Sequence, residues 1–356
     1  MIKEIDIYSA LNRNDLCYID VRSPKEFEDD TIPGAINFPI LDDEEREYVG
    51  YLYKQVDPEK AKEKGLEYAS KKLVHFYQKV KQIISSNKKI ALFCYRGGMR
   101  SNSIARVLDA MGIEIFIIKG GYKSYRKHVI DRLNFLNTKH KYIVLHGYTG
   151  VGKTKILNLL EKKDYSVLDL EKLSRNSGSV FGSIAYDGIS NSQKKFESLL
   201  LEKLDKVNDK MIFTESESKR IGRVVIPDSL FNNMNKGYHI LISTNIENRI
   251  KNTLDDYINI DSKNKDENIR KSIYLLRKRL GNNKVEELIK EFNNKNYEYI
   301  IHELMVNYYD PLYKYSIDKL GQYDKIIEYK EINEAVDQLV NFHNGCRIWK
   351  ESFYEL

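Results

Sequence analysis

The stretch YIVLHGYTGVGKT, from Tyr142 to Thr154, is a short apolar run that leads directly into a glycine-rich loop. The run predicts a buried strand, and the loop matches the phosphate-binding pattern G-x-x-x-x-G-K-[ST]. A helix is expected to follow to about Leu160. Backbone amides in such a loop wrap a phosphate, the lysine reaches the outer phosphates, and the hydroxyl can bind Mg²⁺. The residues predicted to bind a di- or triphosphate are Gly147, Gly150, Gly152, Lys153 and Thr154. The motif alone does not establish nucleotide hydrolysis.

Apolar runs after this loop predict the rest of a P-loop α/β domain. Further strands are expected over Ser166–Leu170, Met211–Thr214 and His239–Ser243, and beyond Thr244 the chain is expected to be helical almost throughout. Carboxylates lie at the ends of the first two strands. Asp169 and Glu215 could therefore hold Mg²⁺ directly or through water, the alternative being solvated or ion-paired carboxylates.

A second loop, FCYRGGMRS from Phe93, places a cysteine between a predicted strand, Lys89–Phe93, and a predicted helix over residues 101–111. Glycines let successive N–H groups face one point, and arginines and the helix N-terminus add positive charge. These features favour a nucleophilic thiolate and a cradle for a tetrahedral oxyanion. The residues of this predicted site are Cys94, Arg96, Gly97, Gly98 and Arg100.

Strands alternate with helices around this loop as well, which predicts a parallel sheet. Strands are expected over Cys17–Val21, Ile36–Phe38 and Ile113–Ile118, with one long helix over Leu66–Ser85. Cys17 is expected in the core and Cys346 outside any site. Three widely spaced cysteines form neither a disulfide framework nor a zinc motif.

Composition sets broad limits on the function. The 356 residues are enough for two domains, and the net charge of +6 permits an anionic partner without requiring one. No apolar run reaches transmembrane length and the N-terminal stretch has no signal-peptide core, so a cytoplasmic protein without a membrane partner is expected. The expected domains are residues 1–135, 136–245 and a mostly helical 246–356.

The thiol loop resembles the active-site loop of rhodanese-like sulfurtransferases. Asp20-Val21-Arg22 and the Ile-Pro-Gly-Ala turn at Ile32–Ala35 are landmarks of that family. However, the five residues between Cys94 and Arg100 also match the spacing of cysteine-dependent phosphatases. Sulfur transfer, selenium transfer and phosphate ester hydrolysis therefore all stay open for this domain, although no obvious general acid for a phosphatase follows the loop.

Five further strings extend the resemblance over almost the whole chain. They are LDDEEREYVGYLYKQ at Leu41, KGGYKSYRKHV at Lys119, DLEKLSRNSGSVFGS at Asp169, ESESKRIG at Glu215 and YYDPLYKY at Tyr308. In this order, with the two loops, they resemble the tRNA 2-selenouridine synthases. The chain departs from the family at Thr31, where histidine is frequent, and at Asn176-Ser177, where His-Arg is frequent.

The resemblance implies a rhodanese-like domain fused to a P-loop domain that converts wobble 2-thiouridine of tRNA to 2-selenouridine through S-geranyl-2-thiouridine. Its implied co-substrates are geranyl diphosphate and selenophosphate, with Cys94 carrying selenium as a perselenide. No obligatory cofactor or resident metal is implied, Mg²⁺ is an option, and an enzyme that supplies selenophosphate is a candidate partner. The alternative is a rhodanese-type sulfurtransferase or phosphatase with an ATP-binding P-loop domain.

The helical C-terminal region contains a basic and partly aromatic stretch. Arg277, Lys278 and Arg279 could contact tRNA phosphates while nearby aromatics stack on bases. A solvated helix face is the alternative interpretation.

Overall fold

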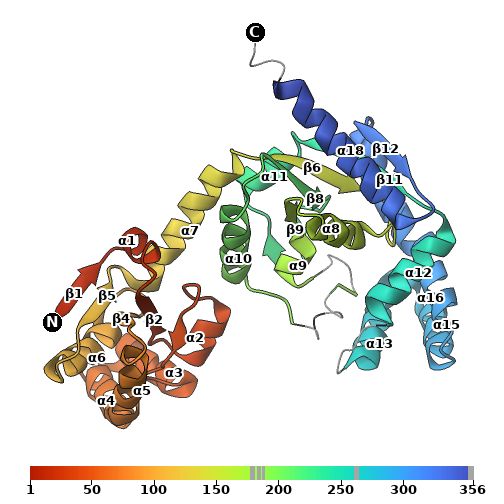
Figure 1. Cartoon of the computed structure of the whole chain (residues 1–356). Coiled ribbons are helices and arrows are strands. Elements are labelled where there is room, and N and C mark those ends of the chain that lie inside the picture. The colour runs from red at the N-terminus through yellow and green to blue at the C-terminus, as the bar shows by residue number, and fades with distance from the viewer. Residues whose placement is uncertain (177–180, 183–185, 187–188, 260–263, 352–356) are drawn as a thin grey trace. The chain divides into compact units, whose positions relative to one another are not determined.

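The computed structural model describes residues 1–176, 181–182, 186, 189–259 and 264–351. The chain forms two compact units, Met1–Arg132 and Leu133–Leu356, and each contains a five-stranded parallel sheet (Figure 1). The α/β class expected from the sequence is thereby confirmed. Among the described residues, no helix is long and apolar enough to cross a membrane.

The sheet of the first unit has the order β1-β5-β4-β2-β3. Its strands are β1 (Ile2–Ile5), β2 (Leu16–Asp20), β3 (Ile36–Asn37), β4 (Lys89–Phe93) and β5 (Ile115–Ile118). Its helices are α1 (Ile7–Leu11), α2 (Pro24–Asp29), α3 (Asp43–Tyr51), α4 (Pro58–Ser70), α5 (Leu73–Ile84), α6 (Met99–Ala110) and α7 (Gly121–Asn137), with a π-helical turn at Leu52–Val56. The central strand β4 pairs with β2 and β5 in parallel and is buried from Ile90 to Phe93. It therefore delivers Cys94 at the carboxyl edge of the sheet.

The single long helix expected over Leu66–Ser85 is wrong, because the structure has two helices there. α4 ends at Ser70 and α5 begins at Leu73. α4 also begins earlier than expected, at Pro58, where the Asp57 side chain accepts a hydrogen bond from the Glu59 N–H. An Asp-Pro pair of this kind is a helix-start signal in the sequence.

The sheet of the second unit has the order β12-β11-β6-β8-β7, and all its pairs are parallel. Its strands are β6 (Lys141–His146), β7 (Val167–Leu168), β8 (Met211–Glu215), β11 (Tyr238–Ser243) and β12 (Lys325–Glu328), with a small hairpin of β9 (Arg220–Ile221) and β10 (Val224–Val225). The helices around it are α8 (Lys153–Lys162), α9 (Leu170–Ser174), α10 (Gln193–Asp205), α11 (Asp228–Met234) and α18 (Ile332–Glu351).

β12 lies in the range that the sequence predicts to be helical. It is an edge strand in which Ile327 is buried while Ile326 is 65% exposed, so its apolar signal is short. α18 follows it and packs Ala335, Val336 and Leu339 against the core of the sheet. The last part of the chain therefore completes the P-loop fold.

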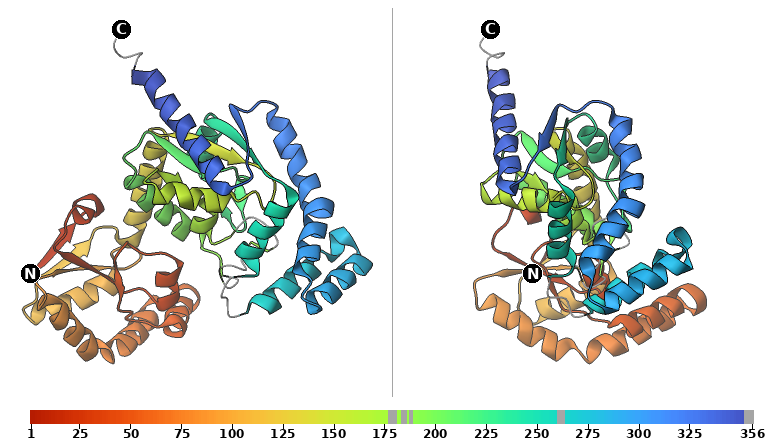
Figure 2. Two further views of the ribbon diagram at one scale, coloured as in Figure 1. Left: turned by 45° about the vertical axis from the view of Figure 1, so that its right-hand side comes forward. Right: turned by 90° about the vertical axis from the view of Figure 1, so that its right-hand side faces the viewer.

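A group of helices between β11 and β12 has its own apolar core and lies beside the sheet of the second unit (Figure 2). These helices are α12 (Ile246–Tyr257), α13 (Lys265–Leu275), α14 (Arg277–Leu280), α15 (Asn282–Asn293), α16 (Tyr297–Leu304) and α17 (Asp310–Leu320), with a π-helical turn, η3 (Met305–Tyr309), between the last two. From this helical group, α12 supplies two side chains, Arg249 and Asn252, that donate hydrogen bonds to the P-loop.

Candidate active sites: a thiol loop and a phosphate loop

Cys94 follows β4 directly and is only 3% exposed. The loop after it turns at Gly97, which has a φ of +66°, and α6 begins at Met99 with Gly98 as its N-cap. The Ser101 hydroxyl, in the first turn of α6, donates a hydrogen bond to Cys94 Sγ over 3.3 Å. Ser101 belongs to the quoted FCYRGGMRS motif, but the sequence interpretation did not assign it a role.

The surroundings of the thiol favour its ionised form. Burial opposes ionisation of Cys94, but hydrogen bonds from the Ser101 hydroxyl, from the Ser101 and Arg96 amides, and the charge of Arg100 together lower its pKa. Burial raises the pKa of Cys17 instead. Of these two cysteines, therefore, only Cys94 lies in surroundings that favour the nucleophilic thiolate.

The two arginines of the loop have different surroundings. Arg100 forms a two-point ion pair with Glu26, with Nη1 to Oε2 at 2.6 Å and Nη2 to Oε1 at 3.3 Å. Glu26 is also 3.5 Å from Arg46 Nε. The side chain of Arg96 is exposed. Arg96 is thus free to approach an incoming anion, while Arg100 is anchored to α2.

The loop is held from behind by the start of α7. A side chain at Gly121 would place its Cβ 2.3 Å from the Cys94 carbonyl oxygen and 2.5 Å from the Gly97 nitrogen. The neighbouring Tyr122 N–H donates to the Cys94 carbonyl over 2.9 Å. Only glycine allows this close approach, which explains the Gly-Gly-Tyr of the KGGYKSY string.

The Asp20-Val21-Arg22 landmark forms a buried network beside the loop. Arg22 Nη2 donates to Asp20 Oδ2 at 2.6 Å, and its guanidinium lies 3.8 Å from the centre of the Tyr122 ring. Thr31, where the sequence departs from the family pattern, donates its hydroxyl to Asp20 Oδ2 at 2.8 Å. The substitution therefore keeps a buried hydrogen bond to the landmark aspartate.

The Ser101 hydroxyl should control the reactivity of Cys94. Ser101→Ala removes a donor to the thiolate, so the pKa of Cys94 should rise and its alkylation by iodoacetamide should need a higher pH. The pH dependence of labelling, followed at the Cys94 peptide by mass spectrometry, measures this. Ser103→Ala is the matched control, because its hydroxyl donates to the Arg100 carbonyl instead. An unchanged labelling midpoint in Ser101→Ala would refute this role.

The phosphate loop follows β6 and ends in α8, in the context that the motif requires. Gly147, Gly150 and Gly152 all have positive φ angles, of +149°, +81° and +73°. A Cβ at Gly147 would lie 2.5 Å from the Ile242 carbonyl oxygen, so only glycine fits there. Lys153 Nζ lies across the loop, 3.2 Å from the Gly147 carbonyl oxygen.

Three successive carbonyls of the loop accept hydrogen bonds from side chains that come later in the chain. Arg249 Nε donates to Thr149 O at 2.8 Å, and Asn252 Nδ2 donates to Gly150 O at 2.9 Å, both from α12. The Tyr329 hydroxyl, after β12, donates to Val151 O at 3.1 Å. Because N–H and C=O of a planar trans peptide point in opposite directions, the bonds at Thr149 and Val151 turn the Gly150 and Gly152 N–H groups to the other side of the loop. The Val151 N–H donates to the Tyr148 carbonyl at 3.3 Å instead.

Arg249 is the key connection in this arrangement. Its Nη1 and Nη2 donate to the two oxygens of Asp310, at 2.9 and 2.6 Å, while its Nε holds the loop. Arg249 is 7% exposed. Asp310 belongs to the YYDPLYKY string, and its partnership with Arg249 gives that string a role in positioning the P-loop.

The carboxylate in contact with Thr154 is Glu171, which is not one of the two proposed from the sequence. Thr154 Oγ1 is 3.4 Å from Glu171 Oε2. Asp169 caps α9 by accepting from the Lys172 N–H, and Glu215 accepts from the Glu171 N–H at 3.0 Å. Glu171 stands two residues after Asp169 in the VLDLE string, but nothing in the sequence distinguishes it.

Burial raises the pKa of Glu171 to about 7, with the charge of Lys153 acting against the rise and that of Asp169 adding to it. Burial and the charge of Glu171 raise the pKa of Glu217 well above its usual range. Within the described residues, no three His, Cys, Asp or Glu side chains are arranged to hold a metal ion. Thr154 and Glu171 are oxygen donors of the kind that Mg²⁺ takes beside phosphates, so they would hold such an ion.

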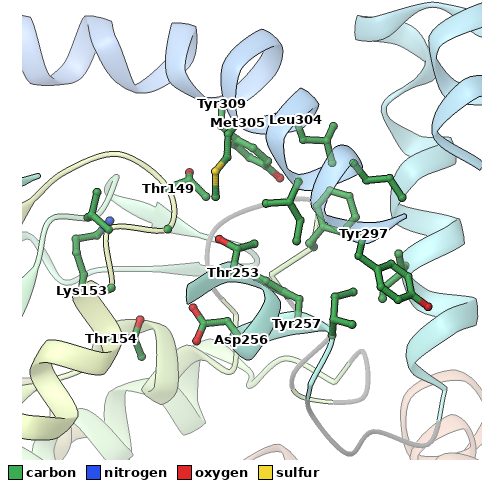
Figure 3. A pocket seen from close by; sticks show the side chains of 18 of the residues that line it. Thr149, Lys153, Thr154, Thr253, Asp256, Tyr257, Tyr297, Leu304, Met305 and Tyr309 are labelled. Carbon is green, nitrogen blue, oxygen red and sulfur yellow. The ribbon is translucent and has the colours of Figure 1, made fainter. Parts of the chain in front are cut away.

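The phosphate loop opens into an apolar pocket formed by the helical group (Figure 3). Lys153, Thr154 and Glu171 line its polar end, together with Thr253 and Asp256 of α12. The rest of the lining is mostly apolar: Val151, Phe181, Tyr257, Ile258, Ile269, Phe292, Tyr297, Ile300, Ile301, Leu304, Met305, Tyr309 and Tyr313. The sequence interpretation missed this pocket.

The basic stretch forms the short helix α14 in the same helical group. Arg277, Lys278 and Arg279 are all exposed. Arg277 lies 5.4 Å from the centre of the Tyr274 ring, and Arg279 lies 5.8 Å from that of Tyr308. The structure thus places the two exposed arginines beside exposed or partly exposed aromatic rings.

The Arg249–Asp310 pair should determine whether the P-loop binds a diphosphate. Arg249→Ala leaves the Asp310 carboxylate and the Thr149 carbonyl without their partner, which should lower the free energy of unfolding by about 1–3 kcal/mol. Inorganic diphosphate should bind roughly tenfold or more weakly. Calorimetric titration and denaturant unfolding measure the two effects.

The test is a double-mutant cycle. Because the pair acts as a unit, Arg249→Ala with Asp310→Ala should cost less than the sum of the single changes. Lys251→Ala, an exposed position on the same helix, is the matched control. Additive effects, or diphosphate affinity unchanged in Arg249→Ala, would contradict the positioning role.

A rhodanese-type thiol loop in one unit and a P-loop with an apolar pocket in the other define the class of the protein, an enzyme built from a rhodanese-like unit and a P-loop unit. Family comparison agrees. Residues 6–128 match the rhodanese-like domain, and residues 140–344 match the tRNA 2-selenouridine synthase AAA domain. The chain belongs to the tRNA 2-selenouridine synthase family.

Three relatives named tRNA 2-selenouridine synthase illustrate the similarity. The Nitrosomonas europaea protein is 32% identical, over 88% of this chain and 92% of its own. The Shewanella halifaxensis protein is 31% identical, over 94% and 97%. The Nitrosomonas eutropha protein is 35% identical, over 71% and 66%. The first two alignments span both units.

Proposed function

We propose that this chain converts wobble 2-thiouridine of tRNA to 2-selenouridine in two steps. The P-loop pocket takes geranyl diphosphate for the first step, and the thiol loop takes selenophosphate for the second. The observation that carries this assignment is the apolar pocket that continues directly from the P-loop.

The pocket favours a donor with a charged head and an apolar tail. Its far part is lined by aliphatic and aromatic side chains of α13, α15 and α16, such as Ile269, Phe292 and Ile300. A ribose or a base placed there would find few hydrogen-bond partners beyond the hydroxyls of the lining tyrosines. A prenyl chain needs none, and burying it in this lining is favourable.

In the first step, the thiocarbonyl sulfur forms a bond to C1 of the geranyl group while the C1–O bond breaks. The bonding electrons leave with the diphosphate, and the N3 proton of the base is lost to water. Negative charge therefore grows on the diphosphate, where the loop amides and Lys153 can stabilise it. Alkylation also turns the sulfur into a thiolate leaving group and makes C2 of the base more electrophilic.

In the second step, selenium replaces the geranylated sulfur. Selenium in selenophosphate is already at the selenide level, so a perselenide on Cys94 would need a two-electron oxidant. We propose instead that the Cys94 thiolate attacks phosphorus and hydroselenide is released. Hydroselenide then adds to C2 and geranylthiol leaves, while water cleaves the phosphocysteine. The Ser101 hydroxyl, which donates to Sγ, stabilises the thiolate as it leaves.

The basic stretch of α14 is the proposed tRNA contact. Arg277 and Arg279 lie beside exposed or partly exposed tyrosines, and this pairing suits phosphates next to unstacked bases. α14 connects α13 and α15, and both of these helices line the pocket. A tRNA bound at α14 would therefore lie on the same helical group as the donor.

Half-reaction assays should show that the two loops serve different steps. Lys153→Ala should slow geranylation of 2-thiouridine tRNA roughly a hundredfold or more, because it removes a group that stabilises the leaving diphosphate. The same variant should still selenate tRNA that is already geranylated. Cys94→Ser should do the reverse and accumulate geranylated tRNA. Nucleoside mass spectrometry after each half-reaction measures both activities.

Matched controls come from the same elements. Lys155 lies on α8 with Lys153 but pairs with Asp255 at 3.5 Å, so Lys155→Ala should retain both steps. Cys17→Ala and Cys346→Ala should also retain both. Normal geranylation by Lys153→Ala, or failure of both variants in both steps, would refute the assignment of one donor to each loop.

A further inference from the structure

The apolar pocket has a defined phosphate end and a defined far end. A Cβ at Gly150 would lie 2.6 Å from Met305 Cε and 2.8 Å from Thr253 Oγ1, so both side chains lie against the P-loop. In Figure 3, Lys153 stands at one end of the pocket and Tyr297 at the other, with Thr253 between them. A donor whose diphosphate is held by the P-loop must therefore extend its tail toward Tyr297.

A pair of aromatic rings, Tyr297 and Phe292, lines the far end. Tyr297 is the first residue of α16, and its ring meets that of Phe292 of α15 edge to face, with centroids 5.6 Å apart. Phe292 is 3% exposed, and the Arg270 guanidinium lies 4.9 Å from the centre of its ring. The Phe292 ring is therefore fixed by its neighbours, and it lines the pocket while packing against Tyr297.

We propose that Tyr297, supported by Phe292, sets the longest prenyl chain that the pocket accepts. The inference rests on the proposed function, since it requires the diphosphate at the P-loop. Each added isoprene unit moves the end of the tail closer to the Tyr297 ring. A chain that is too long must displace a packed ring or leave apolar carbon in water, and both are unfavourable.

Competition between donors tests this directly. The enzyme receives 2-thiouridine tRNA with equal concentrations of geranyl and farnesyl diphosphate, and nucleoside mass spectrometry gives the ratio of the two S-prenyl products. Tyr297→Ala should raise the farnesyl-to-geranyl ratio roughly tenfold or more. Tyr297→Phe should leave it unchanged, because the ring and not the hydroxyl fills the space.

Two further variants make the test specific. Tyr299→Ala is the matched control on α16, because the Tyr299 hydroxyl donates to Glu287 and its side chain does not line the pocket. It should leave the ratio unchanged. Tyr297→Trp should shorten the pocket and favour dimethylallyl over geranyl diphosphate. If thermal unfolding shows that Tyr297→Ala does not fold, the Tyr297→Trp competition tests the chain-length role instead.

The outcomes separate this inference from the proposed function. Wild-type protein that transfers geranyl and farnesyl groups equally, or a folded Tyr297→Ala with the wild-type ratio, would overturn the chain-length role alone. If Tyr297→Ala does not fold, an unchanged dimethylallyl-to-geranyl ratio in Tyr297→Trp would do the same. Wild-type protein that transfers no prenyl group from any of the three diphosphates would overturn the proposed function, and with it this inference.

Discussion

The guanidinium of Arg249 connects the P-loop to the helices that form the pocket. It holds the Thr149 carbonyl on one side and both oxygens of Asp310 on the other. Because the Thr149 and Val151 carbonyls are bound from behind, the Gly150 and Gly152 N–H groups point the other way, toward the proposed phosphate site. Because Asp310 begins α17, directly after η3, the same contact fixes the turn that carries Met305 and Tyr309 into the pocket. Under the proposed function, phosphate binding and tail binding would therefore both depend on this ion pair, in which Arg249 is buried and Asp310 partly buried.

The thiol loop of the first unit is also held from behind by a later part of the chain. It too lies at the carboxyl end of a central parallel strand, where ligands of α/β sheets usually bind. Its backbone is held from behind by Gly121 and by the Tyr122 N–H, which come from the start of α7. Each loop is thus a proposed anion site whose backbone is held by a segment that follows a later strand of its sheet. The difference lies in the nucleophile, since only the thiol loop contains a cysteine.

The sequence predicts the two sheets, the two loops and their residue types, because these depend on local patterns of apolar residues and glycines. It does not predict what lies around the loops. Glu171, Ser101 and Tyr297 belong to the sites because of contacts made in the folded chain. In the sequence, nothing distinguishes them from their neighbours as site residues. β12 was missed because an edge strand with one buried residue has almost no apolar pattern. The pocket is not predicted because its walls come from the P-loop, α9, α12, α13, α15, α16, η3 and α17, and only the tertiary packing brings them together.

If the P-loop pocket is a prenyl diphosphate site, it binds the diphosphate and the apolar tail at once. Calorimetric titration of the whole chain with geranyl thiolodiphosphate, inorganic diphosphate and ATP, at several temperatures, measures this. The geranyl analogue should bind more tightly than the other two. Its negative heat-capacity change should be larger than that for inorganic diphosphate, because apolar surface is buried. Equal affinity for inorganic diphosphate and the geranyl analogue, or tighter binding of ATP, would contradict a prenyl diphosphate site.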